Sequence, residues 1–183
     1  MTHSALPEII SYAEGLVLLK KYLKDDVKRI RHCEGVAKIA YDTAKKIKAK
    51  HPHLPIHPEK VQIAGLLHDI GYAREGGHHE LHSVDILREE HLPEIAEIVL
   101  HSYVYELHLL EGIDDKKHLP MTLENKIVIF ADLVCDHNHE IFAASERIAE
   151  IKERKKHETK RMLALEKAEA RLLLIEAEIL NLL

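Results

Sequence analysis

Two long apolar segments of this 183-residue chain each end in a carboxylate. The first, 63–67, is followed by His68 and Asp69, and the second, 127–131, is followed by Asp132. Segments this apolar belong in a protein core, and burying an uncompensated carboxylate there costs several kcal/mol. No Lys or Arg lies in either run. We therefore expect a fold that brings a metal cation to both carboxylates.

The composition favours an all-α fold. Leu, Ile, Ala, Glu and Lys dominate, whereas the chain has no Trp and only 2 Phe, so strand-forming residues are scarce. Apolar residues recur at helical spacing, and Asp25 or Asp26, Pro58 and Thr122 are typical helix-start residues. The predicted helices before residue 140 cover residues 7–24, 26–50, 58–71, 79–90, 93–107 and 122–136.

Residues 140–183 contain neither Gly nor Pro, which predicts one long helix or two joined ones. We expect a helical domain over 1–140 and a C-terminal extension over 141–183. The segment 152–161 is charged on all sides and is interpreted as a solvated helical connector. A seam with coiled-coil spacing could pack on the domain or pair with a second copy as a homo-oligomer. Its members are Leu165, Ala168, Leu172, Ile175, Ile179 and Leu182.

Composition also excludes several classes of protein. A formal charge of -5 and a pI near 6.3 argue against a binder of nucleic-acid polymers. Cys33 and Cys135 lie far apart, so neither a disulfide framework nor a thiolate zinc site is indicated, and a reducing cytoplasm is expected. Residues 1–12 do not resemble a secretion signal, and no uncharged stretch is long enough for a membrane span.

The candidate ligands of the expected metal are His32, His68, Asp69 and Asp132, because each interrupts a segment that otherwise belongs to the core. Singly, each could be an ordinary polar residue satisfied by hydrogen bonds. Together, imidazole and carboxylate groups suit Mn, Fe, Co, Ni or Zn. Neighbouring helical side chains point about 100° apart. His68 and Asp69 can therefore share an ion most easily if the helix unwinds near Gly71.

The segments around these residues resemble the HD superfamily of metal-dependent phosphohydrolases over about residues 25–140. The likeness lies in 31–37, in 64–71 with its His-Asp-Ile-Gly string, and in 124–132. It implies a compact all-helical HD-type bundle. Further implications concern the ligands: His32, His68, Asp69 and Asp132 would bind a first metal, and Asp69 would bridge to a second if one is bound.

Members of the superfamily with two metals carry additional histidines after the central pair. This sequence offers His78, His79, His82 and His101, of which His79 and His101 match the resemblance best. Tyr72 stands where many relatives have a substrate-binding Lys. No Gly-Tyr-Pro extension is present, so a cyclic dinucleotide is not the expected substrate.

The implied reaction is hydrolysis of a phosphomonoester or phosphodiester by a metal-activated water, with His68 and Asp69 at the catalytic centre. The expected partner is a small phosphorylated metabolite, in particular a nucleotide. Arg29, Arg31, Arg74 and Lys126 flank the ligands and are the candidate phosphate binders. Two alternatives stay open: a non-catalytic module that senses a nucleotide or a metal, and a di-iron oxygenase.

The remaining polar residues of interest have ordinary interpretations. Asp136 is expected to cap the end of its helix or to support the metal ligands from outside. A set of histidines is predicted to lie on the surface: His51, His53, His57, His108, His118, His137, His139 and His157.

Overall fold

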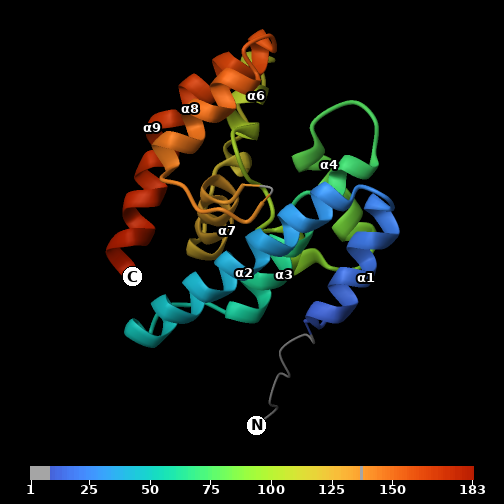
Figure 1. Cartoon of the computed structure of the whole chain (residues 1–183), viewed down its shortest axis with the longest axis vertical. Coiled ribbons are helices and arrows are strands. Elements are labelled where there is room, and N and C mark those ends of the chain that lie inside the picture. The colour runs from blue at the N-terminus through green and yellow to red at the C-terminus, as the bar shows by residue number, and fades with distance from the viewer. Residues whose placement is uncertain (1–8, 137) are drawn as a thin grey trace.

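The computed structural model describes residues 9–136 and 138–183, and the regular elements of these residues are helices (Figure 1). The prediction of an all-α fold is confirmed. No helix in this part of the chain is both long and apolar enough to cross a membrane. In chain order the elements before the C-terminal segment are α1 (Tyr12–Leu23), α2 (Val27–Lys50), α3 (Pro58–Leu67), the 3-10 helix η1 (Ile70–Ala73), α4 (His79–Glu89), α5 (Pro93–Ala96), α6 (Val104–Leu110), the 3-10 helix η2 (Lys116–His118) and α7 (Leu123–Val134).

Side-chain caps set several helix starts. Asp26 accepts a hydrogen bond from the Arg29 amide at 2.9 Å before α2, and Thr122 accepts one from the Asn125 amide at 3.1 Å before α7. These caps satisfy amides that have no partner inside the helix. The first helix begins at Tyr12, after its capping residue Ser11. The predicted start of this helix at Pro7 lies outside the described residues.

Helices α2, α3 and α7 form the centre of the core. Helix α3 packs chiefly against α2, and α7 packs against both (Figure 1). Gly65 allows the close approach, since a Cβ there would lie 3.1 Å from the Ala37 Cα. This packing brings the end of α3 beside the first turns of α2 and the last turns of α7.

Two predicted helices end earlier than expected. Helix α3 stops at Leu67 rather than at Gly71, and Asp69 adopts φ -99° and ψ 8° before the chain continues as η1. The predicted helix over 93–107 is wrong, because it is broken between α5 and α6. Asn125 donates hydrogen bonds to the carbonyls of Ile98 (2.8 Å) and Leu100 (2.6 Å), which withdraws them from helical pairing.

The C-terminal segment forms a helical hairpin of α8 (Ala144–Arg154) and α9 (Thr159–Leu182), which lie side by side in Figure 1. The chain turns between α8 and α9, so two joined helices are found rather than one long helix, and the predicted helical connector over 152–161 is not helical throughout. Helix α9 also packs on α6 and α7. The seam from Leu165 to Ile179 is therefore buried within this chain, and Leu182 is partly buried.

Candidate metal centre

The end of α3 delivers His68 into the interior of the molecule. Its side chain is fully buried, and its Nδ1 donates a hydrogen bond to the Gly65 carbonyl at 2.8 Å. That bond occupies Nδ1 and leaves Nε2 directed at the centre of the cluster. The Nε2 atom is buried without a hydrogen-bond partner. A buried polar atom of this kind indicates a missing partner in the centre of the cluster.

The carboxylate of Asp69 lies at the meeting point of three imidazoles. Its Oδ1 is 3.6 Å from His68 Nε2, 3.3 Å from His79 Nε2 and 3.5 Å from His101 Nε2. Its Oδ2 accepts a hydrogen bond from Arg29 Nη1 at 2.7 Å. The early end of α3 makes this convergence possible, because Asp69 has left helical geometry.

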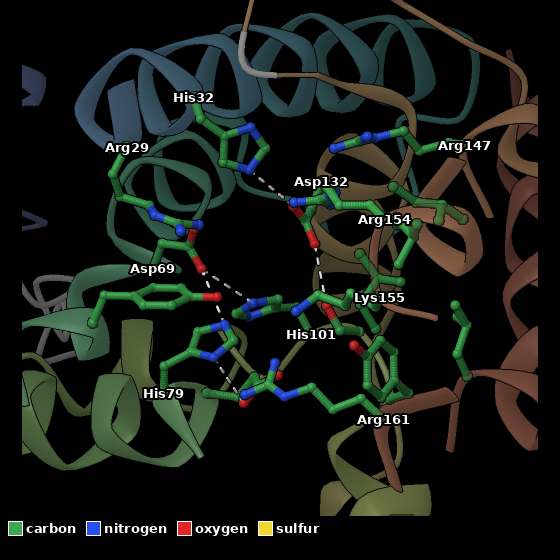
Figure 2. Close-up of a pocket in the computed structure, with 18 of the residues that line it drawn as sticks. Arg29, His32, Asp69, His79, His101, Asp132, Arg147, Arg154, Lys155 and Arg161 are labelled. Carbon is green, nitrogen blue, oxygen red and sulfur yellow. Dashed lines mark hydrogen bonds and ion pairs between the residues drawn. The ribbon is translucent and has the colours of Figure 1, made fainter. Parts of the chain in front are cut away.

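Helix α7 supplies Asp132 on the neighbouring side of His68. The Asp132 Oδ1 lies 3.0 Å from His32 Nε2 and 3.4 Å from His68 Nε2, and Ser102 Oγ donates to Oδ2 at 3.3 Å. The structure thus brings together all six of the metal ligands proposed from the sequence. Figure 2 shows five of them around one space: His32, Asp69, His79, His101 and Asp132.

Gly71 explains how His79 reaches this space. A Cβ at Gly71 would lie only 1.9 Å from the His79 carbonyl oxygen, so another residue here would push α4 away from η1. The Gly71 amide donates to Ser83 Oγ at 2.9 Å, and Ser83 Oγ donates to the His68 carbonyl at 2.6 Å. These bonds hold the first turn of α4 against the end of α3.

His101 lies in the break between α5 and α6. Its Nδ1 donates to the Val99 carbonyl at 2.9 Å, which leaves Nε2 directed at Asp69. Besides Asn125, Arg171 of α9 holds this segment by donating to the Ser102 carbonyl at 3.1 Å. Neither supporting role was predicted, because each depends on a contact between distant parts of the chain.

The two carboxylates stay ionised although Asp69 is buried and Asp132 is half-buried. Burial raises the pKa of Asp69, but the charge on His68 and hydrogen bonds from His101 and His79 hold that pKa well below its usual range. The pKa of Asp132 is also held well below its usual range, because the hydrogen bond from His32 outweighs burial. Burial lowers the pKa of His32, yet the bond to Asp132 raises it to about 10. The two carboxylates therefore stabilise positive charge at the centre of the cluster.

The donor set fits a divalent transition metal. Ligand atoms of His32, His68 and Asp132 lie within 4.8 Å of one another, as do those of His68, Asp69 and His101. A third such group joins His79 and His101 to Glu80, a buried carboxylate that the sequence analysis missed. The sequence did contain a signal for Glu80, because this carboxylate is next to the candidate ligand His79 at the start of a predicted helix.

Comparison with known proteins identifies the family. The family model for the HD domain matches residues 29–136, which is more than half of the chain. The chain belongs to the HD domain family. This family relates it to the superfamily of metal-dependent hydrolases. The uncharacterized protein MJ0778 of Methanocaldococcus jannaschii is 36% identical over 129 residues, which cover 67% of this chain and 74% of that protein. No solved structure matches the chain.

All the candidate ligands except His68 line one side of a cavity of about 470 Å³, within the usual range of small-molecule pockets. The C-terminal hairpin lines the opposite side. Figure 2 shows Arg147, Arg154, Lys155 and Arg161 reaching from this hairpin toward the cluster. We call these residues the basic wall and the ligand cluster the metal wall. The basic wall was missed because its sequence resembles that of any solvated helix.

The residues predicted to bind phosphate are not all at this cavity. Arg29 lines it, paired with Asp69 and stacked over the Tyr72 ring at 3.7 Å. Arg31 is exposed and does not line the cavity. Arg74 and Lys126 do not line it either, and they pair with Glu89 and Glu178, respectively.

The other histidines that were predicted to lie on the surface divide into exposed and buried ones. His53, His57, His139 and His157 are exposed as predicted, and His51 and His118 are partly buried. The prediction for His108 is wrong, because α6 turns this side chain inward. His137 lies outside the described residues. His82 joins none of the ligand clusters formed by the described residues.

Asp136 stabilises the turn that follows α7. Its carboxylate accepts hydrogen bonds from the amides of Asn138 at 2.7 Å and Glu140 at 2.8 Å. The carboxylate therefore does not cap α7, which ends at Val134 with Cys135 as its C-cap, and the capping interpretation is wrong.

Proposed function

We propose that this protein hydrolyses a phosphate ester of a small metabolite of the nucleotide class, either a monoester or a diester. The observation that carries the proposal is the cavity itself, in which a metal wall and a basic wall face each other. A phosphate group between them would meet metal ligands on one side and guanidinium or ammonium groups on the other. Membership of the HD domain family supports the same reaction class.

His32, His68, Asp69 and Asp132 would hold a first ion. His79 and His101 would hold a second ion together with Asp69. The ions proposed are Mn, Fe, Co, Ni or Zn, since the ligands are imidazoles and carboxylates. A bound ion supplies Lewis acidity, which lowers the pKa of a water ligand and polarises the phosphoryl oxygens.

The basic wall would bind the phosphate charge. The Nε of Arg147 is buried with no hydrogen-bond partner, and its guanidinium also pairs with Glu150. A guanidinium offers several donors in one plane and suits phosphate oxygens. Arg154 pairs with the same Glu150 at 3.0 Å, and Lys155 pairs with Glu158 at 3.2 Å. These exposed pairs are weak and can exchange for a substrate.

Tyr72 and Arg29 would position the metal wall. The Tyr72 ring stacks on His79 with centroids 3.9 Å apart, and the Arg29 guanidinium lies over the same ring. Arg29 also fixes one oxygen of Asp69. A positive charge is therefore retained near the place where many relatives have a Lys after the His-Asp-Ile-Gly string.

The test is phosphate release by protein that has been stripped with chelator and reloaded with each metal in turn. Substrates would be nucleoside monophosphates together with mono- and bis-p-nitrophenyl phosphate. We expect metal-dependent release that Asp69→Asn abolishes and Asp85→Asn, an exposed carboxylate on α4, leaves unchanged. Nucleotide binding without release by the loaded protein would contradict the proposal and favour a sensing module. A diferric chromophore with oxygen consumption would favour the oxygenase.

A further inference from the structure

A second group of metal-binding residues lies outside the metal wall. His78 precedes α4, His108 lies near the end of α6, and Glu111 follows that helix. Each offers a ligand atom within 4.8 Å of the others. His78 Nε2 is 3.2 Å from Glu111 Oε1, and the His78 and His108 ring centroids are 5.1 Å apart. The ring of His118, from η2, stands 4.6 Å from that of His108.

This group contains nitrogen atoms that lack partners. The Nδ1 atoms of His78, His108 and His118 are buried without a hydrogen-bond partner, and the His108 side chain belongs to a residue only 8% exposed. Buried polar atoms are nearly always paired in folded proteins. Three unpaired imidazole nitrogens at one place indicate a shared partner that accepts lone pairs, which is what a metal ion does.

The charges around the group agree with this interpretation. Burial and the neighbouring His118 and His78 lower the pKa of His108, so its ring is neutral and its lone pair available. The carboxylate of Glu111 supplies negative charge. The Lys160 ammonium pairs with Glu111 from the start of α9 and is the cation that a metal would have to replace.

The group is separate from the metal wall although His78 and His79 are adjacent in sequence. His79 directs its Nε2 at Asp69, whereas His78 contacts Glu111. The two side chains leave the start of α4 in different directions, because the backbone at His78 is extended and the one at His79 is helical.

We propose that His78, His108 and Glu111 form a zinc site with His118 as the fourth ligand. Nitrogen and oxygen donors in a set of four suit tetrahedral Zn²⁺. The ion would tie the start of α4 to the end of α6 and to η2. It would also compete with Lys160 for Glu111, and so it would loosen one contact between this region and the hairpin that carries the basic wall.

The test compares zinc content after chelator stripping, reloading with Zn²⁺ alone and desalting. Wild-type protein should retain one equivalent more than His78→Gln and Glu111→Gln, whose positions are partly exposed and exposed, so that folding is preserved and can be checked by circular dichroism. His53→Gln and Glu75→Gln, at exposed positions outside both clusters, are the matched controls. Equal zinc content in wild type and both site variants would overturn the proposal.

Cobalt(II) gives a second, independent measurement. The intense visible absorption of tetrahedral Co²⁺ should appear in wild type and in Asp69→Asn, and it should disappear in His78→Gln. Lys160→Met should bind Co²⁺ several-fold more tightly, because the competing ammonium is gone. An unchanged affinity in Lys160→Met would contradict the assignment of Glu111 as a ligand. None of these measurements uses substrate, so the hydrolase proposal can fail while this one stands.

Discussion

The two walls of the cavity are built in different ways. In the metal wall, imidazoles are held by a second contact, as His68 is by the Gly65 carbonyl and His101 by that of Val99. In the basic wall, side chains pair with carboxylates of their own hairpin, and their exposed fractions range from 12% for Arg147 to 55% for Arg154. Rigid ligands suit a metal with fixed geometry. Cations that are partly exposed and paired only within the hairpin suit substrates that bind and leave.

Asp132→Asn should produce the largest effect, because it removes a carboxylate charge that faces both His32 and His68. We expect loss of one metal equivalent and a fall in kcat/KM of at least about a hundredfold, the usual size when one electrostatic group of an active site is removed. Elemental analysis and steady-state kinetics measure the two effects. Normal metal content in this variant would show that Asp132 is not a ligand.

Metal removal should destabilise the fold. A metal present at a hundred times its Kd stabilises the folded state by about 2.7 kcal/mol, which corresponds to about 5–10 °C in Tm for a chain of this size. Thermal unfolding of manganese-loaded and chelated protein measures the difference. Asp69→Asn should show no such shift. An equal Tm for manganese-loaded and chelated wild-type protein would contradict metal binding by the metal wall.

Arg147→Ala should affect substrate binding and leave the metal in place. Loss of a hydrogen bond to a charged group costs about 1.5 kcal/mol, so KM should rise about tenfold with unchanged metal content. Arg88→Ala removes an exposed arginine of α4 outside the cavity and should behave as wild type. If Arg147→Ala lost metal as well, the two walls would not be independent.

Tyr72→Ala should have the smallest effect. It removes the ring between Arg29 and His79, a cation–π contact worth about 0.5–1 kcal/mol, so kcat/KM should fall about two- to fivefold. Tyr72→Phe retains the ring and should match wild type. A large loss in Tyr72→Phe would instead assign a role to the hydroxyl group, which kinetics on the same substrates would reveal.

The sequence could predict the features that depend on local rules. Asp26, Pro58 and Thr122 start helices through local rules, and α2, α3 and α7 begin where these residues predict. His32, His68, Asp69 and Asp132 stand out because each interrupts a segment that otherwise belongs to the core, and this signal is visible without the fold. His79 and His101 were predicted only from the resemblance to the HD superfamily.

Other features depend on contacts between distant residues. The break before α6 follows from bonds made by Asn125, although the apolar pattern from Ile95 to Leu107 is continuous. The turn between α8 and α9 contains neither Gly nor Pro. Arg147 and Lys155 have no local property that distinguishes them from the many solvated Lys and Arg residues, so only the packing of α9 on α6 and α7 reveals their position.

The two walls of the cavity come from separate segments of the polypeptide. The metal wall comes from residues 32–132, whereas the basic wall comes from one uninterrupted stretch, 147–161. Under the proposed function, exchange of this single contiguous segment would change the groups that meet the substrate, while the residues that would hold the metal stay the same.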